Sequence, residues 1–251
     1  MAFTLARAAK GSHAERVQPP SQSQPPAGVV DLWLRQVRPH EPTDEGLLAP
    51  DERERAGRFV DSQARALFVL GRSLLRAALA SYLDYAPQAL RLDQHCLRCG
   101  RQHGKPRLVD PASDLVFNLA HTRGLIALAV CGGYEVGVDV EDRGRATSMP
   151  ELAPLLLSAA ERQALEDVPE ASRPEVLLEY WVGKEALLKA TGEGLSRDPR
   201  GVALPLASGG TAVYRHDGTW WGVCSLDVGP DHAGAVAVRG SVPRVRQRAD
   251  G

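Results

Sequence analysis

The chain of 251 residues has little of several features that define whole classes of protein. Its four cysteines are too few for a disulfide scaffold, and they favour a reducing, cytoplasmic setting. No run reaches the roughly 18 apolar residues of a membrane span, and the first residues lack the apolar core of a signal peptide. The formal net charge of −1 gives no overall field for nucleic acid or an anionic membrane. We therefore expect a cytoplasmic protein that binds neither nucleic acid nor membrane, in which any phosphate site is a local cluster of charge.

The two ends of the chain are also poor in core-forming residues. Residues 18–26 consist of Gln, Pro and Ser, and such a stretch buries no core. We predict a disordered tail over residues 1–28. The end of the chain is rich in arginine, and we predict a loose basic tail over residues 244–251.

Between these ends the composition is that of an ordinary globular protein, with 43% hydrophobic and 24% charged residues. Leucines at helical spacing predict a long helix over residues 61–83, and a second long helix is expected over residues 173–191. Each helix is followed by several short candidate strands. This repetition predicts an α+β fold with two similar subdomains, residues 29–134 and 135–243.

Capping signals mark the starts of two expected helices. Ser158 and Glu161 form a Ser-x-x-Glu pattern, as do Ser172 and Glu175, and each pattern predicts a capping box. We therefore interpret Glu161 as a cap residue. A glycine at position 192 predicts the end of the second long helix.

Arginines cluster on the first long helix and on the charged helix expected before it. Arg72 and Arg76 lie four positions apart, where like charges repel slightly. A shared anionic partner would explain the pair, but on sequence alone we favour two separate surface arginines. Three more arginines lie on the helix expected over residues 44–59, where a solvated face is the usual interpretation and a phosphate-binding patch the alternative. These are Arg53, Arg55 and Arg58.

Four potential zinc ligands lie within nine positions of one another. Adjacent His and Cys residues rarely bind one ion, and no second pair follows at finger spacing. We therefore favour a loop with free thiols over a zinc site. The four residues are His95, Cys96, Cys99 and His103.

The candidate active site joins two short acidic stretches that are about forty residues apart. In the first, alternation along an expected strand places Asp139 and Glu141 on one face, opposite three valines. In the second, Trp181, Glu185 and Lys189 are spaced by four residues, so they lie along one side of the second long helix.

These residue types suit a hard divalent cation beside phosphate. Mg²⁺ is held in proteins by one or two carboxylates together with waters and substrate phosphates. It would neutralise a pyrophosphate and stabilise charge as a P–O bond breaks. Lys189 could neutralise or protonate the leaving phosphate, and a carboxylate could accept a proton from an attacking hydroxyl. The pattern predicts phosphoryl-type transfer from a diphosphate, although spacing alone leaves open a solvated strand end and a helix with ordinary Glu–Lys pairs.

Together, the motifs resemble the 4′-phosphopantetheinyl transferases of the Sfp type. That family joins a Gly-x-Asp-x-Glu strand to a Trp-x-x-Lys-Glu-Ala-x-x-Lys helix, and here these motifs are residues 137–141 and 181–189. Three further segments match in the family's order. They are Gly71-Arg72-x-x-Leu75-Arg76, Gly104-Lys105-Pro106 and Phe117-Asn118-Leu119-Ala120-His121-Thr122. The resemblance covers residues 29–240.

The resemblance implies a pseudo-twofold α+β monomer that binds coenzyme A in the cleft between two pseudo-symmetric halves. It implies Mg²⁺-dependent transfer of phosphopantetheine from coenzyme A to a serine of an apo acyl or peptidyl carrier protein, with release of adenosine 3′,5′-bisphosphate. Carriers of polyketide or non-ribosomal peptide synthesis are the expected acceptors, by analogy with family members of two-half size.

The resemblance also implies roles for individual residues. Asp139, Glu141 and Glu185 would hold Mg²⁺ with the pyrophosphate. Glu185 would activate the serine, directly or through water, and Lys189 would assist the leaving group. The residues expected to bind coenzyme A are Arg72, Lys105, His121 and Lys184, with Arg55 as a further candidate.

Three positions depart from the family pattern. Ala120 stands where a serine often precedes the histidine, and Val182 stands where a small hydroxyl residue is common. Gly183 costs the helix up to about 1 kcal/mol relative to alanine. The carboxylates and lysines are intact, so we expect an active enzyme. The alternatives are a non-catalytic coenzyme A-binding module and a Mg²⁺-dependent phosphodiesterase of unrelated fold.

Overall fold

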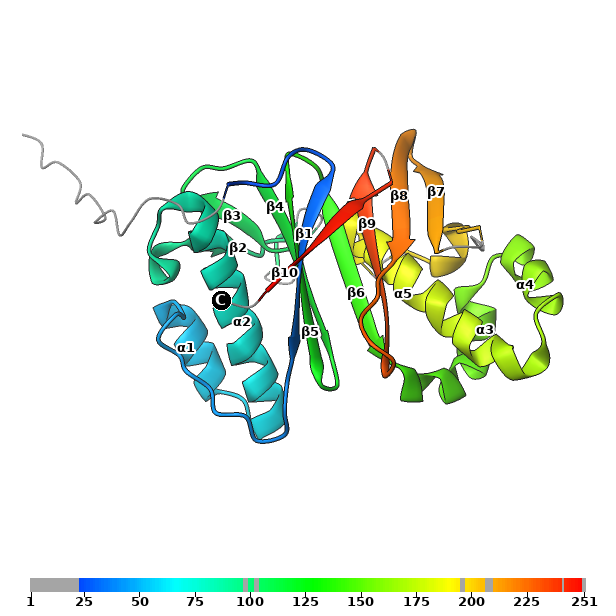
Figure 1. The fold of residues 1–251 in the computed structure, drawn as a ribbon, viewed down its shortest axis with the longest axis horizontal. Coiled ribbons are helices and arrows are strands. Elements are labelled where there is room, and N and C mark those ends of the chain that lie inside the picture. The colour runs from blue at the N-terminus through cyan, green and yellow to red at the C-terminus, as the bar shows by residue number, and fades with distance from the viewer. Residues whose placement is uncertain are drawn as a thin grey trace, which may run out of the picture.

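The structure, a computed structural model, describes residues 23–96, 99–101, 104–194, 197–205, 210–240 and 242–249. Two sheets pack face to face, and each carries one long helix on its outer side (Figure 1). The layers therefore follow the order α2, first sheet, second sheet, α5. The predicted α+β class is confirmed, while the division into subdomains at residues 134 and 135 stays a prediction.

The first sheet has the strand order β10-β1-β5-β4, with α2 on its outer face. Its strands are antiparallel neighbours except β10, which runs parallel to β1. The bounds are Val29–Gln36 for β1, Leu115–Thr122 for β4, Leu125–Gly132 for β5, Arg244–Arg248 for β10 and Ser62–Leu83 for α2.

The second sheet is antiparallel throughout, in the order β6-β9-β8-β7, and α5 covers its outer face. The bounds are Val136–Asp142 for β6, Thr211–His216 for β7, Thr219–Ser225 for β8, His232–Arg239 for β9 and Arg173–Thr191 for α5. As predicted, α5 ends at Gly192, which has a left-handed φ of 77°.

Shorter elements connect these layers. The predicted charged helix is present but begins later, at Pro50, as α1. A separate two-stranded sheet forms from β2 and β3. The remaining bounds are Pro50–Gly57 for α1, Arg91–Asp93 for β2, Arg107–Asp110 for β3, Met149–Leu156 for α3 and Ala159–Glu166 for α4, with short 3-10 turns at Pro87–Ala89, Arg143–Ser148 (η2), Glu170–Ser172 and Pro199–Gly201.

The core between the two sheets explains how β6 is oriented. Val136, Val138 and Val140 are buried in this core and belong to the same cluster as Ala127 and Ala129 of β5. This confirms the predicted alternation, because the polar residues of β6 must then face the other way, toward α5.

A side chain also ties the edges of the two sheets together. The carboxamide Oδ1 of Asn118, on edge strand β4, accepts a hydrogen bond of 2.9 Å from the backbone N–H of Val138, on edge strand β6. The carboxyl-terminal ends of β4 and β6 are therefore held near each other.

Length and composition alone would allow α2 to cross a membrane, although half of its apolar window is buried inside the molecule. Its leucine stripe lies against the first sheet, where Leu70, Leu75 and Leu79 share a cluster with Ile126 and Leu128 of β5. In this fold α2 is the core helix of the first half.

The predicted amino-terminal tail is too long. Residues 1–22 lie outside the described residues, but residues 25–27 already contact the first sheet at Gly132. Ala27 forms a parallel bridge with Gly132 at the end of β5. Residues 25–27 are therefore part of the fold.

The prediction of a loose carboxyl-terminal tail is wrong for residues 244–248, which form β10. The fully buried carboxylate of Asp31 on β1 is the physical reason. It accepts hydrogen bonds from Arg246 Nε at 2.7 Å and from the Tyr82 hydroxyl at 2.5 Å, and Arg248 Nε lies 3.5 Å away. The arginines are paired with a buried charge and do not form a solvated tail.

We expect Asp31→Ala to lower the free energy of unfolding by about 2–4 kcal/mol, because the Tyr82 hydroxyl and the arginines of β10 lose their common partner. Urea unfolding measures this loss. The control is Arg246→Ala, which leaves Asp31 paired with Tyr82 and Arg248, so it should cost about 1 kcal/mol. Equal losses in the two variants would contradict this account of β10.

One of the two predicted capping boxes is confirmed. Ser158 Oγ accepts from the Glu161 N–H at 3.3 Å, and Glu161 Oε2 accepts from the Ser158 N–H at 2.7 Å. The second prediction is wrong, because Ser172 makes no side-chain cap and Glu175 pairs with Arg143 instead.

Candidate active site

The candidate active site exists because α5 approaches β6 very closely at Gly137. A Cβ atom at this position would lie 2.1 Å from the carbonyl oxygen of Ala186 and 2.4 Å from the backbone nitrogen of Ala190. Only a glycine allows this approach, since real Cβ contacts are never so short. The next outward residue of β6, Asp139, therefore meets the side chains of α5.

Asp139, Glu185 and Lys189 come together at this contact, as the sequence predicts. Lys189 Nζ donates a hydrogen bond of 2.5 Å to Asp139 Oδ1. Asp139 is 5% exposed and Glu185 8% exposed. The second oxygen of Asp139, Oδ2, and Oε1 of Glu185 are buried and have no hydrogen-bond partner among the described residues.

The pKa values of both carboxyls reflect this burial. Burial raises the pKa of Asp139 although the Lys189 ammonium acts in the opposite direction. Burial and the neighbouring Asp139 carboxylate raise the pKa of Glu185. Each ionised group would be stabilised by a further positive charge.

Glu141 completes the carboxylate group, but both of its oxygens have partners. Thr122 Oγ1, at the end of β4, donates to Glu141 Oε2 at 3.2 Å. Arg145, on the 3-10 turn η2, forms an ion pair with Glu141 Oε1. The guanidinium of Arg145 also lies over the indole ring of Trp181, 4.6 Å from its centroid.

His121 precedes Thr122 at the carboxyl-terminal end of β4, and its pKa depends on the charges of Lys189 and Glu141. Desolvation by the surrounding protein and the Lys189 ammonium lower its pKa, and Glu141 acts in the opposite direction. A neutral imidazole at this position can donate one N–H to an anion.

The donor set fits a hard divalent cation. Three carboxylates from one strand and one helix could provide oxygen ligands, and within the described part of the chain two of their buried oxygens have no hydrogen-bond partner. Buried unpaired carboxylate oxygens are costly, and a bound cation would remove that cost. The residues that would hold Mg²⁺ are Asp139, Glu141 and Glu185, the three predicted from the sequence.

Lys184 lies outside this group and is engaged within the protein, and its predicted contact with coenzyme A stays a prediction. It is 1% exposed and points away from Glu185, its neighbour on α5. Its Nζ donates to Glu161 Oε2 at 2.6 Å and to the carbonyls of Leu156 and Pro199. All three ammonium protons are used, so no donor remains for a ligand.

We expect Lys184→Met to lower the free energy of unfolding by about 3–5 kcal/mol, because Glu161 is left as a buried charge without a counter-ion. Urea unfolding measures this loss. The double variant Lys184→Met/Glu161→Gln should recover part of it. A stable Lys184→Met protein with weakened coenzyme A binding would instead restore the sequence-based assignment.

Lys105 is also engaged within the protein. Its side chain is 5% exposed, and Nζ donates to Glu135 Oε2 at 2.5 Å and to the carbonyls of Val136 and Ala190. These bonds fasten the loop before β3 to the start of β6 and the end of α5. The structure does not bring Lys105 to the carboxylates, and its predicted contact with coenzyme A stays a prediction.

Arg72 lies in the first half, in a cavity of about 920 Å³ rich in arginine. The prediction of two separate surface arginines is wrong, because Arg72 and Arg76 are both buried and share Glu52. Nε of Arg76 lies 2.5 Å from Glu52 and Nε of Arg72 lies 3.7 Å from it. The arginines of the cavity wall are Arg55, Arg58, Arg72, Arg76 and Arg91.

The Cys and His cluster lies on the loop between β2 and β3. Cys96 is half-buried and Cys99 is exposed, and the choice between a loop with free thiols and a zinc site stays a prediction. His103 lies outside the described residues, so the zinc alternative stays untested.

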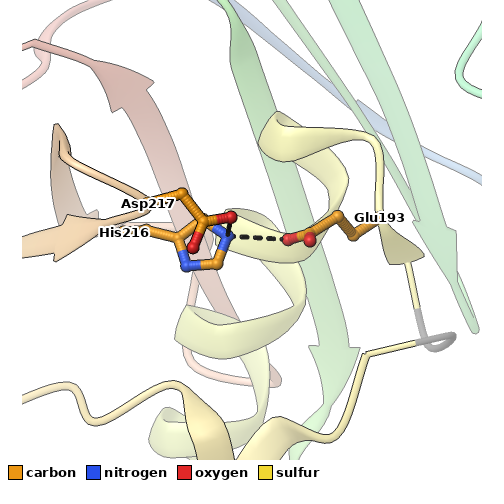
Figure 2. A group of neighbouring side chains, drawn as sticks. All are labelled: Glu193, His216 and Asp217. Atoms are coloured by element: carbon orange, nitrogen blue, oxygen red, sulfur yellow. Dashed lines mark hydrogen bonds and ion pairs between the residues drawn. The ribbon is translucent and has the colours of Figure 1, made fainter.

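A second group of possible metal ligands was not anticipated from the sequence. Figure 2 shows Glu193, after the end of α5, facing His216 and Asp217 at the tip of the β7–β8 hairpin. His216 Nε2 lies 2.8 Å from Glu193 Oε2 and 3.5 Å from Asp217 Oδ2. Arg197 already provides a cation, 3.1 Å from Glu193. The group shares no residue with the predicted metal ligands and links α5 to the hairpin.

Sequence analysis missed the role of Arg145 at the main site. Arg145 follows Glu141 by four residues, a spacing that allows an ion pair if the chain between them is helical. The sequence alone does not show that the turn after β6 is helical. Sequence analysis likewise found Glu161 as a cap but not as the partner of Lys184, which is 23 residues away.

Comparison with known proteins agrees with this geometry. Residues 135–237 match the model of the 4′-phosphopantetheinyl transferase superfamily. The 4′-phosphopantetheinyl transferase HetI of Nostoc sp. is 34% identical over 152 residues, 60% of this chain and 62% of that protein. A putative 4′-phosphopantetheinyl transferase of Synechocystis sp. is 36% identical over 169 residues, 66% of this chain and 65% of that protein.

A more distant relative is the human L-aminoadipate-semialdehyde dehydrogenase-phosphopantetheinyl transferase, 26% identical over 174 residues, 65% of this chain and 52% of that protein. The chain thus spans less than two thirds of the length of each of these three relatives. The matched segment of the family model contains Asp139, Glu141, Glu185 and Lys189. Over residues 135–237, the chain is therefore similar to the 4′-phosphopantetheinyl transferase superfamily.

Proposed function

We propose that the protein transfers the 4′-phosphopantetheine group of coenzyme A to a serine of an apo acyl or peptidyl carrier protein, with Mg²⁺, and releases adenosine 3′,5′-bisphosphate. One observation carries the proposal: Asp139 Oδ2 and Glu185 Oε1 are buried without partners beside Lys189, within the segment that matches the superfamily. A cation at these oxygens would supply charge stabilisation for a diphosphate.

Residues of the chain would bind the phosphates, accept the serine proton and neutralise the leaving group. The serine hydroxyl attacks the phosphorus that bears the pantetheine group, and the P–O bond to the adenosine bisphosphate breaks. Glu185, whose pKa is raised by burial, accepts the serine proton directly or through water. Lys189, 28% exposed in its side chain, neutralises charge on the leaving phosphate. His121 donates to the pyrophosphate or to the 3′-phosphate region.

The nucleotide end of coenzyme A carries an additional phosphate, and the arginine-rich cavity suits it. Arg55 of α1, Arg58 directly after α1 and Arg72 of α2 line the cavity wall. A planar guanidinium group can donate two parallel hydrogen bonds to the oxygens of one phosphate. The cavity supports the proposal that Arg72 and Arg55 bind this phosphate, as the resemblance implies.

We further propose that the protein acts as a monomer in the cytoplasm and serves carriers of polyketide or non-ribosomal peptide synthesis. Support for the acceptor class is the resemblance to two-half transferases, which is an analogy of size. The experiment is to incubate the protein with a panel of apo carriers, coenzyme A and Mg²⁺ and to measure each carrier's mass. Addition of one phosphopantetheine to a carrier supports the proposal, and no gain across the panel would refute it.

Two alternatives give different results in the same experiment. A coenzyme A-binding module without turnover would bind coenzyme A in calorimetry and leave every carrier unmodified. A phosphodiesterase would release adenosine 3′,5′-bisphosphate from coenzyme A without any carrier. Carrier-dependent product release excludes both.

A further inference from the structure

The three carboxylates of the site are not equally available to a cation. Asp139 and Glu185 each offer a buried oxygen without a partner. Glu141 has none to offer, because Thr122 donates to one oxygen and Arg145 pairs with the other. A metal ion that takes Glu141 as a ligand must therefore displace Arg145 or share its carboxylate.

The position of Arg145 is well defined by the elements around it. Asp142 caps the turn η2 by accepting from the Gly144 N–H at 2.7 Å, which brings Arg145 back over the end of β6. The indole of Trp181 then supports the guanidinium from the α5 side, 4.6 Å from its centroid. Trp181 is one helical turn before Glu185, so this support lies beside the carboxylate group.

We propose that Arg145 is a positioning residue that competes with the divalent cation for Glu141 and so sets the affinity of the site for metal. The guanidinium acts in two ways, by occupying Glu141 Oε1 and by repelling a second positive charge nearby.

Arg145 can change partners without leaving the site. Its side chain is 35% exposed, compared with 17% for Glu141, so the guanidinium has space on the solvent side. The Trp181 ring can hold it while Glu141 turns to a cation. The guanidinium group of Arg145, once displaced from Glu141, would face solvent beside the metal. There it could donate hydrogen bonds to an anionic phosphate oxygen. Metal and diphosphate should consequently bind better together than separately.

The inference rests on the proposed function only in assuming that the carboxylates bind a divalent cation. The test is direct binding of Mn²⁺, followed by the EPR signal of the free ion, to the whole protein and its variants. Arg145→Gln should bind Mn²⁺ about three- to tenfold more tightly than the unmodified protein. Arg145→Lys keeps the charge but loses the planar guanidinium group, so its Mn²⁺ affinity should lie between those of the unmodified protein and Arg145→Gln. It replaces Arg145→Gln in the test if that variant fails to fold.

The matched control is Arg143→Gln. Arg143 lies on the same turn and loses the same charge, but it pairs with Glu175 and not with Glu141. Its Mn²⁺ affinity should stay within about twofold of the unmodified protein. Equal tightening in both arginine variants, or no tightening in Arg145→Gln and Arg145→Lys, would overturn the inference while leaving carrier modification intact. Absence of Mn²⁺ binding in every protein would overturn both the inference and the metal site, and the carrier mass assay would decide separately on transfer.

Discussion

Asp139→Asn is expected to reduce phosphopantetheine transfer by about a thousandfold, since a catalytic metal supplies several kcal/mol of charge stabilisation. The substitution keeps the size of the side chain and one oxygen, but it removes the charge that a cation needs. It also removes the ionic partner of Lys189, whose Nζ lies 2.5 Å from Asp139 Oδ1. The measurement is the initial rate of mass gain on a carrier at saturating coenzyme A.

The same variant should be at least as stable as the unmodified protein at pH 8. The pKa of Asp139 is raised in the folded state by burial, above about 3.9 in an unfolded chain. The folded state therefore binds more protons in the interval between the two pKa values, and stability falls as the pH rises through it. Asparagine has no such ionisation cost. The free energy of unfolding of Asp139→Asn should exceed or equal that of the unmodified protein at pH 8, and the difference should shrink toward pH 4.

Asp142→Asn is the matched control for this prediction. Asp142 lies three residues further along β6, and its Oδ1 accepts a backbone hydrogen bond that an asparagine oxygen can also accept. Transfer by Asp142→Asn should stay within about threefold, since a surface substitution of this kind costs little. Loss of stability in Asp139→Asn, or equal loss of activity in the two variants, would show that the Asp139 effect is structural and not due to the metal site.

Local periodicity predicted the carboxylate group well, and the physical reason is simple. Alternation along β6 and four-residue spacing along α5 each specify one face, and both faces meet across a single helix–strand contact. The same rule explains why Lys184 does not join this group. It follows Trp181 by three residues and precedes Glu185 by one, so it is rotated about 100° from Glu185 around α5 and faces the buried side. A motif places residues next to each other in sequence, but helix geometry decides which of them share a site.

Long-range pairing accounts for the features that sequence analysis could not predict. The partner of Asp31 is Arg246, which is 215 residues away, and no local pattern connects them. Arg72 and Arg76 are buried because Glu52, on a different helix, provides their counter-charge. In each case a charged residue that looks solvated by itself is buried with a distant partner, which the composition of its own segment does not reveal.

Gly137→Ala is expected to lower the free energy of unfolding by about 3 kcal/mol or more, beyond the usual cost of overpacking. The added methyl group would lie 2.1 Å from the carbonyl oxygen of Ala186 and 2.4 Å from the backbone nitrogen of Ala190. Both of these atoms belong to the backbone of α5. Backbone cannot rotate away as a side chain can, so β6 and α5 must separate. Because Asp139 belongs to β6, and Glu185 and Lys189 belong to α5, the separation also moves the catalytic groups apart. A displacement of about 1 Å costs on the order of a hundredfold in rate.

Gly183→Ala distinguishes this steric effect from a general effect of adding a methyl group to the site region. Gly183 lies on α5 two residues before Glu185, and its added Cβ would meet the end of the flexible Leu204 side chain at 3.2 Å. Alanine gains up to about 1 kcal/mol of helix propensity over glycine, which offsets that contact. Gly183→Ala should therefore keep its stability within about 1 kcal/mol, measured by urea unfolding, and should keep its transfer rate. A Gly137→Ala protein as stable and active as Gly183→Ala would mean that β6 and α5 can separate without cost, and the close approach would then not be what positions the carboxylates.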